Sequence, residues 1–307
     1  MTAEELNAIV ESKEFPEFVR VCEARQNRRI AAMADAIAAE PGVRLVLMTG
    51  GSSAGKTTSA KRLCTQLGAD GIPVEYVSTD DFFVGNALNP RDENGEFDYE
   101  TIECVDRPLL SERLGALLEG REIPRHRFDF IAHEPYDADE TMRLDKDGVV
   151  ILEGLHALNP ELLPGLGVKT FGVFVEPKPD AEFARSLSLS SRDVRLLRRI
   201  VRDGQYRKIS AGETLKMWPK VTAGEEKWIL PFRHLAKAQF NSFLDYELSI
   251  LKPVAQGHLE KERIKNPDDA KVAQLLETLD GIAAASPVVV PGDSILRETI
   301  GGSLLEY

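Results

Sequence analysis

Short apolar runs alternate with amphipathic segments along most of this chain, a pattern typical of a parallel sheet covered by helices. Residues 1–40 carry apolar side chains at helical spacing, so we expect helix there, with a break near Pro16 and an end at Pro41. The apolar run at 44–49 predicts a buried strand. A glycine-rich turn follows it, and the pattern then predicts a helix over 56–67.

Further strands are expected where apolar residues cluster again, at 74–78, 149–152, 171–175, 247–251 and 288–290. Apolar spacing predicts a helix near 267–284, between the last two of these strands, and a basic helix is expected at 193–203. The stretch from 84 to 145 is polar and carries Gly, Pro and many charges. The order of these elements predicts an α/β fold with a mostly parallel sheet and helices on both faces.

Composition and charge exclude several classes of function. With 307 residues, 43% of them hydrophobic, the chain can bury a sizeable core as one large α/β domain or two smaller ones. A formal net charge of -12 argues against a general nucleic-acid binder, because such a protein needs a broad basic surface.

Cysteine usage and the amino terminus predict a cytoplasmic protein without a membrane partner. Cys22, Cys64 and Cys104 form no Cys-x-x-Cys pair, and their odd number does not suit a disulfide framework or a zinc site. The amino terminus is acidic and lacks a signal-peptide core. No apolar run approaches the ~20 residues that a spanning helix needs.

Residues 50–57 read GGSSAGKT and match the phosphate-binding pattern G-x-x-x-x-G-K-[ST]. Such glycines allow a tight turn whose N–H groups surround phosphate oxygens, and the helix that follows adds its positive dipole end. Lys56 is expected to reach the β- and γ-phosphates, and Thr57 to place its hydroxyl on Mg²⁺. The predicted nucleotide-binding residues of this loop are Gly50, Gly51, Ser52, Ser53, Ala54, Gly55, Lys56, Thr57 and Thr58.

A second metal-side group is expected at the end of a neighbouring strand. Glu153 leaves the apolar run 149–152 beside Gly154, which is a poor place for a side chain with a core role. Mg²⁺ takes one or two carboxylates together with waters and substrate phosphates. We therefore predict a P-loop NTPase fold in which Thr57 and Glu153 are the metal-side residues.

Six sequence blocks, in their order and spacing, resemble the uridine kinase and phosphoribulokinase family, and most closely its bacterial uridine kinase-like members. They are GGSSAGKTT at 50–58, STDDFF at 78–83, EFDYETIECVD at 96–106, FDFIAH at 128–133, ILEGLHAL at 151–158 and DVRLLRRIVRD at 193–203. The resemblance runs from about Arg44 to Pro253. The sequence SILRETIGGS, at 294–303, is similar to a tail of some bacterial members, and its chemistry suggests no role.

The resemblance implies roles for residues of an acceptor site. Asp80 matches the family's catalytic aspartate, a base that accepts the proton of the attacking hydroxyl, and the adjacent Asp81 would face the other way in an extended segment. Asp98 matches the aspartate that holds the hydroxyls of the acceptor sugar. Phe128 and His133 match residues that line the nucleobase pocket. Because the family usually has a tyrosine hydroxyl where this chain has Phe128, loose or altered base selectivity is expected.

The predicted basic helix carries Arg195, Arg198, Arg199 and Arg202 at i, i+3, i+4 and i+7, which places them on one face. Four guanidiniums repel one another unless an anion comes to them or acidic surface pairs with them. In the family this region is a lid whose arginines close over the triphosphate, which Arg suits because it binds phosphate bidentately. The resemblance thus implies that Arg199 and Arg202 are catalytic. It further implies that Arg198 binds nucleotide and Arg195 binds substrate, and Arg207 resembles a further lid arginine.

The pattern and the resemblance together divide the chain into three parts. They are a helical segment at 1–42, a P-loop kinase domain at 43–260 with its lid at about 185–230, and a helix, strand and tail at 261–307 packed on that domain. The oligomeric state is left open, with a homo-oligomer among the alternatives.

The phosphate-binding loop predicts an enzyme that uses ATP or GTP with Mg²⁺, and the resemblance implies a kinase that phosphorylates the 5′-hydroxyl of uridine or cytidine in nucleoside salvage. A kinase of another small acceptor, such as a sugar phosphate, would need an extra cationic pocket. A nucleotide-operated switch would need an Asn-Lys-x-Asp guanine reader, and the sequence contains none. Intact Lys56, Thr57, Asp80 and Glu153 argue against a regulatory protein that binds nucleotide without turnover.

Overall fold

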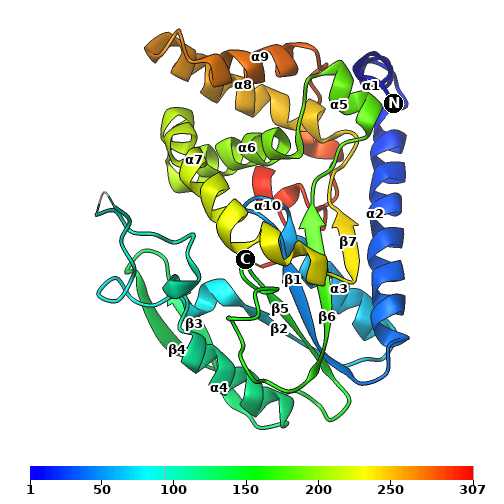
Figure 1. Ribbon diagram of the computed structural model, residues 1–307. Helices are drawn as coiled ribbons and strands as arrows, with labels where there is room; N and C mark the ends of the chain where they lie inside the picture. Colours follow the sequence, from blue (N-terminus) through cyan, green and yellow to red (C-terminus); the bar gives the residue numbers. More distant parts are fainter. Residues whose placement is uncertain (94, 307) are drawn as a thin grey trace.

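The computed structural model describes residues 1–93 and 95–306. A five-stranded parallel sheet in the order β2-β5-β1-β6-β7 lies at its centre (Figure 1). Its strands are β1 (Val43–Thr49), β2 (Val74–Ser78), β5 (Val149–Glu153), β6 (Lys169–Glu176) and β7 (Ala238–Asn241). β3 (Ile123–Asp129) and β4 (Glu134–Met142) pair antiparallel in a separate two-stranded sheet. The prediction of a mostly parallel α/β sheet is confirmed.

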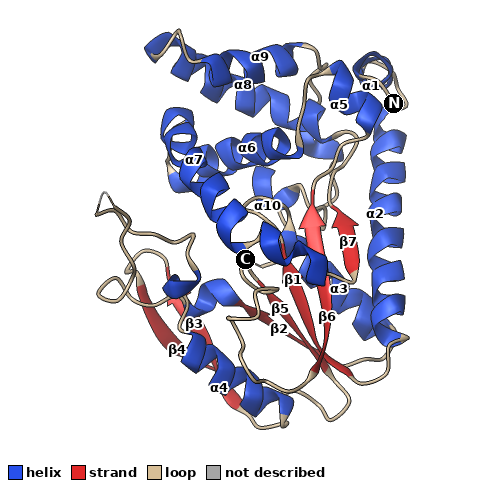
Figure 2. Cartoon of the chain, in the orientation of Figure 1, coloured by secondary structure: helices blue, strands red, loops and turns tan. Residues whose placement is uncertain are grey.

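Helices cover both faces of the central sheet, as Figure 2 shows. They are α1 (Ala3–Val10), α2 (Phe15–Ala38), α3 (Lys56–Ala69), α4 (Arg107–Leu118), α5 (Ala181–Ser186), α6 (Ser191–Arg202), α7 (Ala211–Trp228), α8 (Glu247–Lys265), α9 (Ala270–Asp280) and α10 (Arg297–Ile300). Val46 and Met48 of β1 pack with α2 and α3, whereas Leu45 packs with α4 on the other face. This alternation follows from the two-residue period of a strand.

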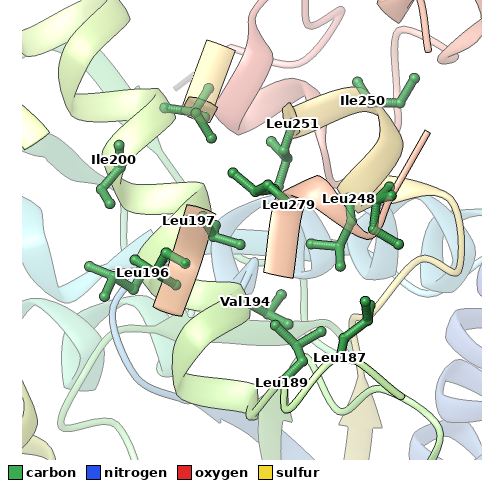
Figure 3. Close-up of a cluster of buried hydrophobic side chains, with 14 of the residues drawn as sticks. Leu187, Leu189, Val194, Leu196, Leu197, Ile200, Leu248, Ile250, Leu251 and Leu279 are labelled. Carbon is green, nitrogen blue, oxygen red and sulfur yellow. The ribbon is translucent and has the colours of Figure 1, made fainter. Parts of the chain in front are cut away.

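A second layer of helices carries its own apolar core beyond the carboxyl end of the sheet. Leu196, Leu197 and Ile200 of α6 pack there against Leu251 of α8 and Leu279 of α9 (Figure 3). Packing against α8 holds α6 in this layer, beyond the carboxyl end of the sheet. No helix in the described ranges has both the length and the apolar character needed to cross a membrane.

Two predicted strands are wrong. Residues 247–251 form the first turns of α8, where Leu248, Ile250 and Leu251 are all buried. A short apolar run that is buried on every side has no periodicity to separate strand from helix. Val288 and Val289 lie in the 3-10 turn Pro287–Val289, which Val290 follows, and Pro287 has no N–H to donate to a sheet.

Other elements match or extend the prediction. The helix expected near 267–284 is α9. The helix break expected near Pro16 lies just before this proline, between the end of α1 at Val10 and the start of α2 at Phe15. Pro16 itself lies in the first turn of α2, where its missing N–H costs no helical hydrogen bond. The sequence did not predict α4, α7, β7 or the β3–β4 hairpin.

Candidate active site

The phosphate loop (residues 50–57) joins β1 to α3. At Gly50 and Gly51 the neighbouring groups leave no room for a side chain. A Cβ on Gly50 would lie 2.2 Å from a carbonyl oxygen of β6, and one on Gly51 would overlap the guanidinium of Arg195. Gly55 has φ +84°, in the left-handed region, and directly precedes α3. The loop is therefore a tightly packed backbone turn at the start of a helix, the arrangement that surrounds phosphate groups with N–H donors.

Glu153 lies at the end of β5, and the parallel register places it between the ends of β1 and β2. Its Oε2 accepts hydrogen bonds from Thr57 Oγ1 at 3.2 Å and Tyr76 OH at 3.1 Å, and its Oε1 lies 3.7 Å from Lys56 Nζ. Burial raises the pKa of Glu153 to about 7, although Lys56 acts in the opposite direction. A hydroxyl and a carboxylate thus meet beside the lysine, and this oxygen donor set fits Mg²⁺.

Asp80 follows β2, in the 3-10 turn Thr79–Phe82, close to this group. Asp80 is exposed at the surface, but the protein around its carboxylate partly desolvates it, and this desolvation raises its pKa. Lys56, Arg207 and Arg202 oppose this shift, so cations surround the carboxylate. Asp81 has a separate partner, because its Oδ2 accepts a hydrogen bond from Arg127 at 3.2 Å.

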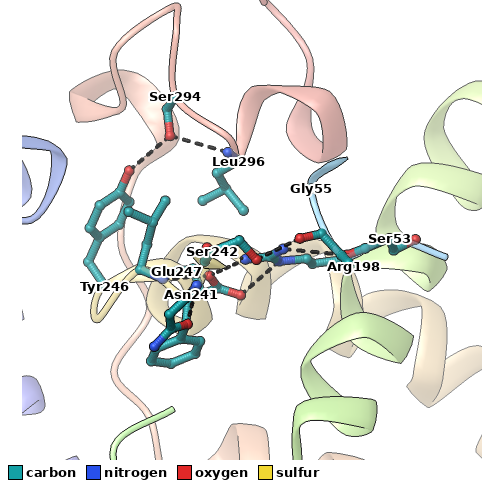
Figure 4. A network of polar contacts seen from close by, with 12 residues as sticks. Ser53, Gly55, Arg198, Asn241, Ser242, Tyr246, Glu247, Ser294 and Leu296 are labelled. Carbon is teal, nitrogen blue, oxygen red and sulfur yellow. Dashed lines mark hydrogen bonds and ion pairs between the residues drawn. The ribbon is translucent and has the colours of Figure 1, made fainter. Parts of the chain in front are cut away.

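Two arginines of α6 fix the phosphate loop and are themselves buried. Arg195 donates to the carbonyl of Ser52 at 2.8 Å, pairs with Glu225 of α7 and stacks on the ring of Trp218. Arg198 binds both oxygens of Glu247, at 3.0 and 2.7 Å, and the carbonyl of Ser242 at 2.9 Å (Figure 4). Pairing with distant carboxylates removes the repulsion expected on this face of the helix.

The arginine cluster consists of Arg199, Arg202 and Arg207 around the carboxylate of Asp203. Asp203 is fully buried, and the three guanidiniums lie 3.2, 3.1 and 3.7 Å from its oxygens. Arg199 also donates to Ser52 Oγ of the phosphate loop at 3.0 Å. Burial lowers the pKa of Arg207 to about 10, and the two neighbouring guanidiniums add to the effect. Three cations share one anion, so the cluster keeps an excess of positive charge beside the loop.

The residues predicted to bind the acceptor lie in the loop before α4 and in the β3–β4 hairpin. Asp98 accepts a hydrogen bond from the N–H of Glu100 at 3.1 Å. Phe128 is buried and forms a T-shaped pair with Phe83, with ring centroids 5.7 Å apart. His133, in the hairpin turn, has its Nδ1 3.4 Å from the hydroxyl of Tyr99. A tyrosine hydroxyl therefore accompanies the histidine, supplied from position 99 rather than 128.

Sequence reasoning missed the residues that hold this site together. They are Asp203, Glu225 and Glu247, which pair with the arginines, and Tyr99 beside His133. Asp203 ends the last family-like block and stands four residues after Arg199, which is a helical pairing distance. Glu225 and Glu247 lie 30 and 49 residues from their partners, and no local signal pointed to them.

A parallel sheet whose first strand leads through a glycine-rich loop into a helix, with Lys56, Thr57 and Glu153 gathered at the loop, defines a P-loop nucleotide-binding protein. Residues 45–248 match the Phosphoribulokinase / Uridine kinase family, and the chain belongs to this family of kinases.

Two relatives named uridine kinase agree with that assignment. The chain is 31% identical over 161 residues to a uridine kinase of Deinococcus deserti, an alignment that covers 52% of this chain and 68% of the relative. It is 28% identical over 149 residues to a uridine kinase of Lactobacillus johnsonii, with coverage of 48% and 68%. A solved structure described as a possible uridine kinase from Bacillus stearothermophilus superposes with a TM-score of 0.42 and 20% identity, covering 71% of this chain and 100% of that one.

Proposed function

We propose that the protein transfers the γ-phosphoryl group of ATP or GTP to the 5′-hydroxyl of a pyrimidine nucleoside, uridine or cytidine. The observation that carries this proposal is the convergence of Lys56, Thr57, Glu153 and Asp80 at the carboxyl ends of β1, β2 and β5. Donor-side groups and a candidate base thus lie within one small volume. Relatives named uridine kinase support the choice of acceptor class.

On the donor side, the phosphate loop binds the triphosphate through its backbone, and Lys56 neutralises the terminal phosphates. Thr57 and Glu153 would hold Mg²⁺, which supplies charge neutralisation to the phosphates when bound. Arg199 and Arg202 carry positive charge of the arginine cluster. They stabilise the negative charge on the phosphoryl group in the transition state of its transfer. Positioning and charge supply most of the catalysis in phosphoryl transfer.

On the acceptor side, Asp80 accepts the proton of the 5′-hydroxyl as that oxygen attacks the γ-phosphorus in line, and the bond from that phosphorus to the bridging oxygen breaks to release the nucleoside diphosphate. Lys56, Arg207 and Arg202 oppose the rise in the pKa of Asp80 that the surrounding protein causes, and so favour the ionised carboxylate that a base requires. Asp98 accepts hydrogen bonds from the sugar hydroxyls. Tyr99 and His133 offer a hydroxyl and a ring nitrogen to the polar edge of the base.

A direct test is phosphorylation of a panel of nucleosides, phosphosugars and other hydroxyl compounds, with mass detection of the product. We expect uridine and cytidine 5′-monophosphate, and no product from Lys56→Ala, which removes the lysine of the loop. Product from a phosphosugar but from no nucleoside would overturn the acceptor assignment and leave the kinase. Triphosphate hydrolysis without any phosphorylated acceptor would overturn the kinase itself.

A second test asks whether Tyr99 with His133, or instead Phe128, recognises the polar edge of the nucleobase. Tyr99→Phe and His133→Ala should each lower kcat/KM for uridine by about tenfold, because one neutral hydrogen bond is worth roughly 0.5–1.5 kcal/mol. Phe128→Tyr should have less effect, since this ring is buried and already packs against Phe83. Loss of activity only on changing Phe128 would refute the role of Tyr99.

A further inference from the structure

The C-terminal tail (residues 294–302) lies against the phosphate loop, more than two hundred residues away in sequence. Figure 4 shows Ser294 hydrogen-bonded to the hydroxyl of Tyr246 and to the backbone of Leu296. Ser294 shares a hydrogen bond with Tyr246 at 3.2 Å, and Leu296 is fully buried. Ile295 packs so closely that a Cβ on Gly55 would lie 2.6 Å from its Cγ2. The tail therefore packs directly against the end of the phosphate loop, at Gly55.

Glu298 of the tail contacts the first turn of α3. Its Oε2 accepts a hydrogen bond from Thr58 Oγ1 at 3.0 Å, across 240 residues of sequence. α3 has glycine as its N-cap, makes no side-chain capping bond and has no acidic residue in its first turn. A carboxylate near the start of a helix stabilises it through the unpaired N–H groups and the helix dipole. Glu298 thus supplies from the tail an acidic group that the local sequence of α3 lacks.

The same tail contacts the turn that carries the arginine cluster. Gly301 has φ +82°, and a Cβ there would lie 1.8 Å from the hydroxyl oxygen of Tyr206. Tyr206 belongs to the turn Asp203–Arg207, which also holds the shared carboxylate and one of the three guanidiniums. The short helix α10, within the tail, packs on α6. One segment thus contacts the phosphate loop through Ile295 and, through Gly301, the turn that carries part of the arginine cluster.

We propose that the C-terminal tail is a positioning element of the donor site, in which Glu298 fixes the first turn of α3 and Gly301 fixes the turn of the arginine cluster. The inference rests on the proposed function only in taking the phosphate loop to bind a nucleoside triphosphate. Glu298 acts through Thr58 and does not itself touch the reacting atoms. Its loss weakens triphosphate binding and leaves acceptor binding unchanged.

The test measures the Kd of ATP with Mg²⁺ by calorimetry, on the full chain, for three variants. Glu298→Ala should raise the Kd about tenfold, the effect of one hydrogen bond to a charged group. Glu298→Gln keeps an oxygen that accepts from Thr58 and should lose only about threefold. Asp293→Ala removes an exposed carboxylate just before the tail and should match the wild type. In kinetics, Glu298→Ala should raise KM for ATP while KM for the acceptor stays constant.

Several outcomes would overturn the proposal. An unchanged Kd in Glu298→Ala, or equal losses in all three variants, would remove the role of Glu298. A lower melting temperature with equal losses in every kinetic constant would make the tail a purely structural segment. If Glu298→Ala does not fold, Gly301→Ala is the variant to measure. It should lower kcat and leave the affinity for ATP nearly unchanged, and an unchanged kcat would refute the positioning role of the tail. Failure of the wild type to bind any nucleoside triphosphate would instead refute the proposed function.

Discussion

Replacing Asp203 by Asn tests whether the arginine cluster is held ready for an anion. Asp203 is fully buried, and its two oxygens serve Arg199, Arg202 and Arg207 as well as the hydroxyl of Thr214 at 3.4 Å. Asn has nearly the same shape but no charge. Three guanidiniums would then lose the buried carboxylate that they share, with Asp80 and Glu100 left as nearby anions.

The magnitude follows from burial. Removing one partner of a buried ion pair costs about 3–5 kcal/mol, because the remaining charge stays desolvated. Burial and like charge already lower the pKa of Arg207 to about 10, and Asp203 works against that shift. We therefore expect Asp203→Asn to lower the free energy of unfolding by about 3–5 kcal/mol at low salt and neutral pH.

The assay is urea denaturation with and without pyrophosphate. An anion in the donor site can replace part of the missing negative charge. The difference in free energy of unfolding between wild type and Asp203→Asn should therefore be smaller when pyrophosphate is present. Asp245→Asn is the matched control, because Asp245 pairs with the more exposed Arg25 at 3.4 Å and should cost at most about 1 kcal/mol. A loss below about 1 kcal/mol for Asp203→Asn, or a deficit that pyrophosphate leaves unchanged, would refute the reasoning.

Three further predictions concern the site. Asp80→Asn should lower kcat by about 10²- to 10⁴-fold with little change in ATP affinity, and a drop under tenfold in single-turnover kinetics would deny it the role of base. Arg199→Ala and Arg202→Ala should lower kcat more than they weaken acceptor binding, whereas Arg198→Ala should chiefly destabilise the fold, by about 3–5 kcal/mol, by leaving its carboxylate partner buried and unpaired. The opposite pattern would exchange these roles. Burial raises the pKa of Glu100 to about 7, so its contribution to stability is full below about pH 4.5 and is lost as the pH rises through 7. Relative to Glu100→Gln, the wild type should lose up to about 3 kcal/mol between pH 5 and 8, and a constant difference in denaturation midpoints would contradict this.

Local sequence was enough wherever structure and chemistry depend on neighbours in the chain. The loop at 50–57 is preceded by the apolar run of β1 and followed by a helix, so strand, turn and helix could all be predicted from contiguous residues. The same holds for β2, whose predicted and observed bounds coincide, and for Glu153 at the end of β5. These elements are specified by periodicity and by glycine, which act over a few residues.

Only the tertiary structure decided which charges are paired and which keep an excess. Helical spacing placed four arginines on one face, but it could not reveal that Glu225 and Glu247 bury two of them against the phosphate loop. The same limit made residues 247–251 look like a strand, because their burial comes from α6 and α9 rather than from a sheet. The tail contact of Glu298 with Thr58 was equally hidden. A side chain's own helix sets the direction in which it points, whereas its partner comes from a segment that only folding brings near.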